Sequence, residues 1–219
     1  MKAKNVKDRP GELIRYCEAH TTPVSEVLYR LERETHLRTL SPQMLSGHLQ
    51  GQLLRMISAM IRPRQALEIG TFTGYSAICI AVGMPADSVL HTIEANVELR
   101  YMVEKYVAEA GLTERIRLHI GNALDIVPAL EGPFDLVWID AGKLDYADYY
   151  DMVFDKVSPG GYILADNVLW SGKVISENRD ADTEALHRFN QKIQADTRVE
   201  NIILPIRDGI LMARKLPGA

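Results

Sequence analysis

The chain has 219 residues, of which 47% are hydrophobic and 25% are charged, and its formal net charge at pH 7 is −4. This size suits one α/β domain with a full hydrophobic core, so we expect residues 1–219 to form a single domain. The negative charge argues against nucleic acid or an anionic membrane as a partner, because such partners usually require a basic face. The sequence has no bilayer-length apolar run and its start has no apolar signal segment, so we expect a cytoplasmic protein.

The first part of the chain, residues 10–62, has the apolar spacing of amphipathic helices. Apolar residues recur at helical intervals between Val24 and Leu31. A Ser41-Pro42 step then introduces a second helical pattern, which ends at Arg62-Pro63. We therefore expect at least two helices before the first strand.

After residue 63, short apolar segments alternate with helical stretches, which predicts a parallel sheet with helices on both faces. Near the end of the chain, a turn at Pro205–Gly209 separates two apolar segments and predicts an antiparallel hairpin. The predicted fold is therefore a doubly wound, mostly parallel, seven-stranded α/β sheet with a C-terminal antiparallel hairpin and N-terminal helices. Before the hairpin, the predicted strands are Gln65–Ile69, Val89–Ile93, Ile116–Ile120, Phe134–Ile139 and Tyr162–Ala165, and the predicted helices are Tyr75–Val82, Val97–Ala110, Leu124–Leu130, Tyr146–Val157 and Asp182–Ala195.

Glycines follow the first predicted strand, in the segment from Glu68 to Ser76. Glycine between a strand and a helix lets a ligand approach the backbone, and the crevice at the carboxyl edge of such a sheet is the expected ligand site. Gly70 and Gly74 do not form the Gly-x-Gly-x-x-Gly dinucleotide fingerprint. Glu94 follows the second strand, where an acidic residue accepts hydrogen bonds from ribose hydroxyls in folds of this kind. Together these residues predict a nucleoside-cofactor site, although ordinary turn glycines and a solvated Glu94 are the alternatives for each feature alone.

Two more predicted strands end in polar residues. Asp140 follows the strand Phe134–Ile139, and Asp166 and Asn167 follow the strand that ends at Ala165. Because the carboxyl ends of parallel strands meet at one edge of a sheet, these side chains are expected to converge beside the cofactor crevice. Two carboxylates and an amide suit Mg²⁺, with Mn²⁺ or Ca²⁺ as substitutes, and the lack of histidine and cysteine disfavours zinc. The alternative, that both carboxylates only stabilise loops, is favoured for one carboxylate and not for three converging ligands.

Lys143 lies three residues after Asp140. A bound cation would disfavour the charged ammonium through like-charge repulsion. The resulting neutral amine would accept a proton from a bound hydroxyl group as a general base. The alternative is an exposed surface lysine, which is the commoner fate of this residue type.

These motifs resemble those of a known family, the cation-dependent O-methyltransferases that include the catechol and caffeoyl-CoA O-methyltransferases. The resemblance covers about residues 24–215, and its most specific parts are ALEIGTFTGYS, VWIDAGKLDY, LADNVLWSGKV and LPIRDGILMARK. The segment DNVLWSGKV and the terminal LP-x-x-DG pattern are closest to the caffeoyl-CoA branch and its bacterial relatives. The resemblance implies a Rossmann-like methyltransferase sheet, S-adenosylmethionine as cofactor, a divalent metal and a homodimer.

The matching positions imply roles for individual residues. Residues 1–62 would form a helical extension whose MLSGHLQGQLL helix closes over the cofactor as a lid, and residues 63–219 would form the catalytic core. An acidic residue that anchors the second hydroxyl in the animal catechol enzyme has no match, because Ile202 occupies its approximate place. The implied cofactor contacts are Ser46, Glu68, Gly70, Thr71, Ser76, Glu94, Ala123 and Asp140, the implied metal ligands are Asp140, Asp166 and Asn167, and the implied catalytic residues are Lys143 and Asp140.

The predicted reaction is methyl transfer from S-adenosylmethionine to one hydroxyl of a small, catechol-like vicinal diol. The metal would hold both oxygens, and Lys143 would take the proton. One alternative is a nicotinamide-dependent oxidoreductase, which the missing dinucleotide fingerprint argues against. The other is a non-enzymatic small-molecule binding protein, which would not need the combination of two carboxylates, an amide and a lysine.

Overall fold

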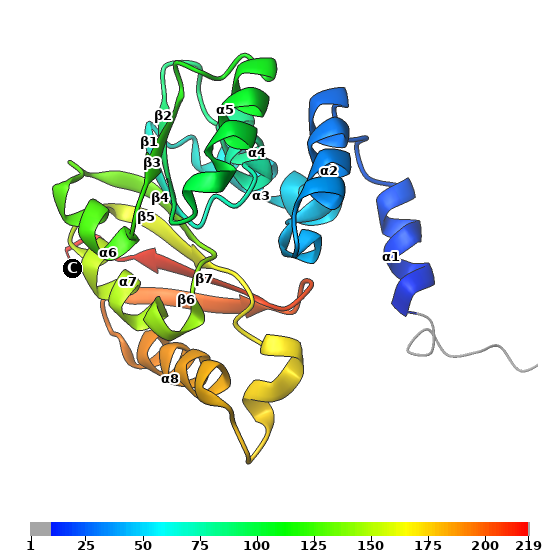
Figure 1. Cartoon of the computed structure of the whole chain (residues 1–219). Helices are drawn as coiled ribbons and strands as arrows, with labels where there is room; N and C mark the ends of the chain where they lie inside the picture. The colour runs from blue at the N-terminus through cyan, green and yellow to red at the C-terminus, as the bar shows by residue number, and fades with distance from the viewer. Residues whose placement is uncertain (1–9, 219) are drawn as a thin grey trace, which may run out of the picture.

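A computed structural model describes residues 10–218. The prediction that the start of the chain has no signal segment therefore falls mostly on residues outside the described range. Within this range the centre of the molecule is a seven-stranded sheet in the order β3-β2-β1-β4-β5-β7-β6 (Figure 1). The first five strands pair in parallel, whereas β7 is antiparallel to both β5 and β6. The predicted mostly parallel sheet with an antiparallel C-terminal hairpin is therefore confirmed. The strands are β1 (Gln65–Ile69), β2 (Val89–Glu94), β3 (Ile116–Ile120), β4 (Phe134–Ile139), β5 (Val157–Ala165), β6 (Val199–Leu204) and β7 (Ile210–Lys215).

Helices flank the sheet and precede it. The α-helices are α1 (Pro10–Ala19), α2 (Glu26–Arg38), α3 (Gly47–Ile61), α4 (Tyr75–Gly83), α5 (Arg100–Glu109), α6 (Ala123–Ile126), α7 (Tyr146–Phe154) and α8 (Ala181–Ala195). Short 3-10 turns are η2 (Pro42–Met44), η3 (Val97–Leu99), η4 (Val127–Ala129), η5 (Lys143–Asp145) and η6 (Trp170–Ile175). None of these described helices has both the length and the apolar character needed to cross a membrane.

Two adjacent element boundaries differ clearly from their predictions. The strand β5 begins at Val157, five residues before the predicted start at Tyr162, and the preceding helix α7 ends earlier, at Phe154. The pairing with β4 shifts register between Phe134 and Leu136, which is the geometry of a β-bulge. Gly160, with φ +83°, lets the chain continue through a segment whose proline and glycines resemble a turn.

The sheet buries both of its faces, and the strand β4 shows how. Side chains alternate along a strand, so Val137 packs with the helices α7 and α8, whereas Leu136 and Trp138 face α3 and α4. Trp138 is fully buried. Each fully buried aliphatic side chain contributes roughly 1.5–3 kcal/mol of hydrophobic stabilisation. The two clusters hold the strand ends, and the polar residues after them, in fixed positions.

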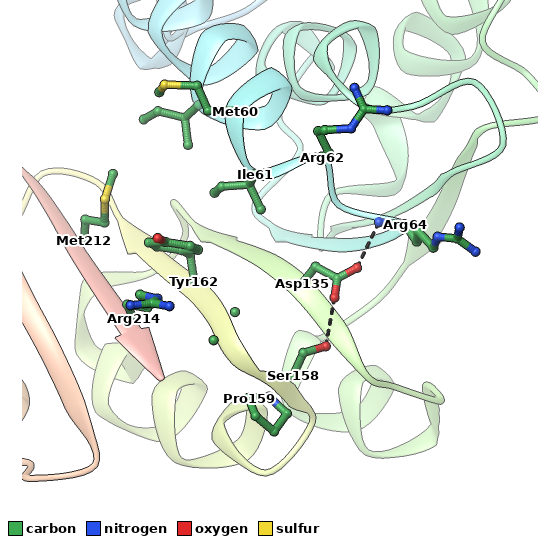
Figure 2. Close-up of a pocket in the computed structure, with 13 residues that line it drawn as sticks. Met60, Ile61, Arg62, Arg64, Asp135, Ser158, Pro159, Tyr162, Met212 and Arg214 are labelled. Atoms are coloured by element: carbon green, nitrogen blue, oxygen red, sulfur yellow. Dashed lines mark hydrogen bonds between the residues drawn. The ribbon is translucent and has the colours of Figure 1, made fainter. Parts of the chain in front are cut away.

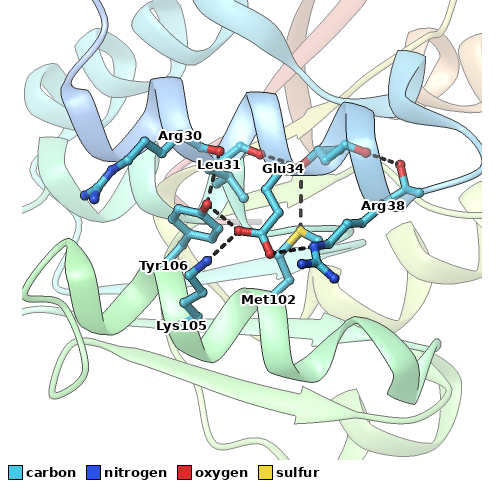
Figure 3. A network of polar contacts seen from close by, with 9 residues as sticks. Arg30, Leu31, Glu34, Arg38, Met102, Lys105 and Tyr106 are labelled. Atoms are coloured by element: carbon cyan, nitrogen blue, oxygen red, sulfur yellow. Dashed lines mark hydrogen bonds and ion pairs between the residues drawn. The ribbon is translucent and has the colours of Figure 1, made fainter.

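The helices α2 and α3 are built into this core, whereas α1 lies at the outside of the molecule (Figure 1). Glu34 of α2 accepts hydrogen bonds from Lys105 Nζ at 2.5 Å and Tyr106 Oη at 2.7 Å, which ties α2 to α5 (Figure 3). One residue on, the buried Thr35 hydroxyl lies 3.0 Å from the Thr73 hydroxyl in the turn after β1. The part of residues 1–62 that touches the predicted cofactor turn is therefore firmly packed.

Candidate active site

The two acidic residues that follow β4 and β5 lie side by side at the carboxyl edge of the sheet. Ile69 of β1 pairs with Ile139 of β4, and Ile139 pairs with Ala165 of β5. The backbone hydrogen bonds of the sheet continue one residue past the ends of β4 and β5. Asp140 N donates to Ile69 O at 2.8 Å, and Asp166 N donates to Ile139 O at 2.9 Å. The predicted convergence of strand ends is thus present in the fold.

The glycine turn after β1 brings two strand ends together. Gly70 has φ +100°, and a Cβ atom at this position would lie 1.9 Å from the carbonyl oxygen of Asp140. The sequence pattern predicts a glycine here for the approach of a ligand, whereas the structure shows that the neighbouring strand already requires it. Gly74, with φ +95°, forms the N-cap of α4. Both glycines therefore shape the crevice through the backbone.

Glu68 lies directly before this turn and is fully buried. Its Oε2 accepts from Thr92 Oγ1 at 2.5 Å, and Thr71 Oγ1 lies 2.5 Å from the same threonine hydroxyl. Burial raises the pKa of Glu68 to about 8, and the nearby Ser76 and Thr92 hydroxyls oppose that shift. Glu68 Oε1 makes no hydrogen bond within residues 10–218. Since an unpartnered buried oxygen is costly, this atom is a candidate contact for a bound cofactor.

Glu94 lies at the end of β2 and is half-buried. Its Oε2 accepts from Phe72 N at 2.7 Å and its Oε1 accepts from Asn96 N at 2.8 Å. Burial raises the pKa of Glu94, while these and neighbouring backbone N–H groups oppose the shift. Phe72 has φ +50°, so the carboxylate also holds a strained turn, a role that the sequence did not reveal. Each oxygen keeps a second lone pair, which leaves Glu94 able to accept from ribose hydroxyls.

Two predicted cofactor contacts come from neighbouring elements. Ala123 is the first residue of α6 and is buried, and the turn before it joins β2 because Gly121 N donates to Glu94 O at 2.9 Å. Ser46 directly precedes α3 and is buried, and its carbonyl accepts a hydrogen bond from Arg207 in the hairpin turn. Ala123 therefore adjoins the Glu94 side of the crevice, and Ser46 is fixed from the hairpin side.

Asp166 is the more deeply buried of the two carboxylates, with 2% of its surface exposed. Its Oδ1 accepts from Asn167 N at 2.8 Å, and its Oδ2 accepts from Gln50 Nε2 at 2.5 Å. Burial, and next the negative charge of Asp140, raise the pKa of Asp166. Asn167 adopts φ +59°, a left-handed conformation that non-glycine residues hold at a cost. A buried carboxylate whose ionisation is opposed by the neighbouring Asp140 charge, next to an amide, is a suitable environment for a hard cation.

Across residues 10–218, no group of three or more His, Cys, Asp or Glu side chains is arranged to hold a metal. The candidate ligand set is therefore limited to the two carboxylates, Asp140 and Asp166, and the amide of Asn167. Such a set leaves coordination positions for water or substrate oxygens, because Mg²⁺ takes about six oxygen ligands.

Lys143 is not an exposed surface lysine, since only 11% of its side chain is accessible. Its Nζ donates to Asp140 Oδ1 at 3.1 Å and to Tyr146 Oη at 2.7 Å, and it lies 5.9 Å from the ring centre of Trp170. Tyr146 Oη in turn donates to Asp166 O at 3.0 Å. Tyr146 was not predicted as a site residue, although its position three residues after Lys143 at the start of a helix was an available clue.

The loop after Asn167 is strained and is held by the hairpin turn. Trp170 has φ +46° and Ser171 has φ +54°. Asp208 fastens this loop, because its carboxylate accepts from Ser171 N and its carbonyl accepts from Leu169 N at 2.9 Å. The turn predicted at Pro205–Gly209 therefore supports the loop that carries Trp170 beside Lys143.

A groove of about 680 Å³ lies elsewhere on the molecule (Figure 2). It is lined by the starts of β4 and β5 and by the end of α3, so it lies at the amino ends of the parallel strands. Its carboxylate, Asp135, already accepts from Arg64 N and Ser158 Oγ, both at 2.8 Å. The strand-end site holds paired carboxylates and a lysine instead, so we place the chemistry there and not in this groove.

Residues 18–216 match a family model described as O-methyltransferase. The chain belongs to the O-methyltransferase family. A catechol O-methyltransferase from Niastella koreensis is 36% identical over 160 residues, covering 71% of this chain and 72% of the relative. Caffeoyl-CoA O-methyltransferase 1 from Eucalyptus globulus is 32% identical over 180 residues, covering 76% and 73%. The crystal structure of the O-methyltransferase TomG from Streptomyces achromogenes, involved in tomaymycin synthesis and solved with SAM, superposes with a TM-score of 0.88 at 29% identity, covering 97% and 100%.

Family membership confirms that the chain is an O-methyltransferase, as the sequence motifs predicted. It favours this enzyme class over the two alternatives, an oxidoreductase and a binding protein without activity. The structural similarity along nearly the whole chain agrees with the predicted Rossmann-like methyltransferase fold.

Proposed function

We propose that this O-methyltransferase transfers the methyl group of S-adenosylmethionine to one hydroxyl of a catechol-like vicinal diol, with a divalent cation at Asp140, Asp166 and Asn167. The observation that carries the proposal is the pair of carboxylates at neighbouring strand ends, one of them bonded to Lys143. The names of the catechol and caffeoyl-CoA relatives support a vicinal-diol acceptor. Methyl transfer to a panel of catechols, caffeoyl esters and monophenols, assayed with S-adenosylmethionine and Mg²⁺, tests it.

The cofactor is proposed to lie across the carboxyl edge from β2 to β4. Glu94 would accept from its ribose hydroxyls, and the unpartnered Oε1 of Glu68 would accept from a cationic donor such as an ammonium group. The relative solved with SAM supports this choice of cofactor. The full set of proposed contacts is Ser46, Glu68, Gly70, Thr71, Ser76, Glu94, Ala123 and Asp140.

The side chains of the site have distinct proposed tasks. A bound divalent cation supplies Lewis acidity, which eases loss of a phenolic proton near neutral pH. Lys143 Nζ, held between Asp140 and Tyr146, is placed to take that proton in its uncharged form. Trp170, on the strained loop beside Lys143, would limit access of water and contact an aromatic ring. Correct orientation of the acceptor oxygen towards the methyl group contributes most of the rate.

Replacing Glu94 with alanine is expected to weaken S-adenosylmethionine binding by about 1–3 kcal/mol, because a charge-assisted acceptor is lost. Since Glu94 also holds Phe72 N and Asn96 N, Glu94→Gln should be compared, because it keeps the size of the side chain and one acceptor oxygen while it loses the charge and the second acceptor. Glu98→Ala, at an exposed position just beyond the strand, is the matched control. Calorimetric affinity of Glu94→Ala equal to that of the control would reject the ribose assignment.

Cofactor affinity is expected to rise with pH up to about 8, because Glu68 is largely protonated below this pKa and must ionise to bind a cationic donor. Folding raises this pKa from its ordinary value of 4.5, so Glu68 contributes stability below about pH 4.5 that is lost as the pH rises through about 8. Glu68→Gln should remove both pH dependences and weaken binding. Titration calorimetry and thermal unfolding across this pH range check the prediction, and equal slopes for variant and wild type would contradict it.

We also propose that residues 1–62 serve as a lid over the cofactor, that residues 63–219 form the catalytic core of a single domain, and that the chain is a homodimer. Exposed apolar side chains on the N-terminal helices support the dimer. Light scattering on the full chain is expected to give twice the monomer mass. The exposed side chains are Leu13, Ile14 and Tyr16 of α1 and Met56 and Met60 of α3.

A further inference from the structure

Gln50 of α3 connects the candidate cation site to the hairpin turn. It is completely buried. Its Nε2 donates to Asp166 Oδ2 at 2.5 Å, and its Oε1 accepts from Arg207 Nη1 at 2.6 Å. A single amide thus joins an N-terminal helix, the end of β5 and the turn between β6 and β7.

The chemistry of its two neighbours fixes the orientation of the Gln50 amide. A guanidinium group can only donate hydrogen bonds, and an ionised carboxylate can only accept them. The amide oxygen must therefore face Arg207 and the amide nitrogen must face Asp166, since a flipped amide would oppose donor to donor and acceptor to acceptor. The position of Arg207 is in this way transmitted through Gln50 to one oxygen of Asp166.

Arg207 also holds the start of α3. Its Nη1 donates to the carbonyl of Ser46, and its Nη2 donates to the carbonyl of Leu45 at 3.2 Å. Arg207 itself adopts φ +50°, a backbone conformation that is unfavourable for arginine and must be maintained by these contacts. Ser46 is a proposed cofactor contact, so the same side chain fixes a residue of the cofactor crevice and the amide that orients Asp166.

We propose that Gln50 and Arg207 are positioning residues that couple occupancy of the cofactor crevice to the binding of a divalent cation at Asp166. The inference rests on the proposed function, because it assumes cofactor contact at Ser46 and a cation at Asp166. A shift of α3 away from the crevice would withdraw the Gln50 donor from Asp166 Oδ2, and that oxygen would lose its fixed position while Oδ1 keeps its hydrogen bond from Asn167 N. Because thermodynamic coupling is reciprocal, the cofactor strengthens cation binding by the same factor by which the cation strengthens cofactor binding.

The test measures the Mn²⁺ affinity of the full chain by calorimetry, with and without saturating S-adenosylhomocysteine. This compound is the demethylated product of the cofactor and has no methyl group to transfer. In the wild type, S-adenosylhomocysteine is expected to tighten Mn²⁺ binding by a factor in the usual range of coupled sites, about 5- to 150-fold. In Gln50→Met, which keeps the length of the side chain without its polar atoms, this factor should fall to about one. Gln52→Met, two residues along the same helix, is the matched control and should keep the wild-type factor.

Arg207 is tested in the same way, because it acts only through Gln50 and the helix start. Arg207→Met should lower the coupling factor, and Arg207→Lys should partly restore it by returning one donor. Arg62→Met is the control, since Arg62 lies at the opposite end of α3 in a similar left-handed conformation, with φ +56°. Backbone hydrogen exchange in residues 45–54 gives a second readout: Mn²⁺ should slow exchange in the wild type and in Arg62→Met, and not in Arg207→Met.

The outcomes separate this inference from the proposed function. If Gln50→Met has the thermal stability of the wild type and also keeps its coupling factor, the inference is overturned and the proposed function is unaffected. If Gln50→Met does not fold, Gln50→Leu replaces it, because it also lacks both the donor to Asp166 and the acceptor for Arg207. Absence of Mn²⁺ binding to the wild type would overturn the proposed cation site and the coupling together.

Discussion

Lys143→Ala is expected to lower kcat by about 10²–10⁴-fold, the usual effect of removing a general base, with cofactor affinity close to the wild-type value. The expectation follows from the position of Lys143, whose Nζ contacts Asp140 and Tyr146 and lies near Trp170 on the substrate side of the crevice. Lys173→Ala, which removes an exposed lysine from the same region of the chain, should leave kcat unchanged.

A second substitution distinguishes proton transfer from electrostatic support. Lys143→Arg keeps the positive charge and the ability to donate to Asp140, but a guanidinium group cannot accept a proton at neutral pH. We therefore expect Lys143→Arg to be almost as slow as Lys143→Ala under saturating substrate. Recovery of wild-type kcat in Lys143→Arg would show that charge, and not proton acceptance, is what the lysine contributes. Wild-type turnover in Lys143→Ala would reject any role in the chemical step.

The sheet was predictable because each strand is marked by its own residues and by the turns directly beside it. The bounds of β1, β3 and β4 coincide with the predicted segments, since short apolar runs flanked by polar turns mark buried parallel strands. The grouping of Asp140 and Asp166 then followed from a rule of topology, that parallel strands end at one edge. The start of β5 was mispredicted because a bulge around Gly160 carries the strand through a segment that resembles a turn.

Contacts made across the fold were not predictable in the same way. The hydrogen bond from Gln50 to Asp166 spans 116 positions of the sequence, and the one from Arg207 to Gln50 spans 157. No periodicity or local motif relates such residues, because their meeting depends on how α3 and the hairpin turn pack against the finished sheet. The same holds for the elevated pKa of Glu68, whose first cause is complete burial, a property of the packed core.

Asp166→Asn is expected to abolish most methyl transfer and with it any response to added Mg²⁺ or Mn²⁺. The substitution keeps the shape of the side chain and an oxygen that can accept from Gln50 Nε2, but it removes one of two charged oxygen donors from the proposed site. It also removes a like charge beside Asp140, which offsets the loss of the oxygen that accepts from Asn167 N, and thermal unfolding of the apo variant, measured beside its activity, separates loss of function from loss of fold. Asp87→Asn, at an exposed position before β2, is the matched control.

The wild-type enzyme should correspondingly lose its activity in excess chelator and regain it with Mg²⁺ or Mn²⁺, because Asp140, Asp166 and Asn167 would hold a cation that supplies Lewis acidity and leaves positions for the oxygens of a vicinal diol. A monophenol offers one oxygen in place of two, so it should bind more weakly and react more slowly through poorer orientation of the attacking oxygen. S-adenosylmethionine should still bind to the chelated enzyme and to Asp166→Asn, since its main proposed contacts, Glu68 and Glu94, lie on β1 and β2. Calorimetry of cofactor binding and methyl-transfer assays on paired diol and monophenol substrates separate these effects. Rapid methylation of a monophenol in excess chelator would rule out the cation and leave Asp140, Asp166 and Asn167 as residues that stabilise the strand-end loops.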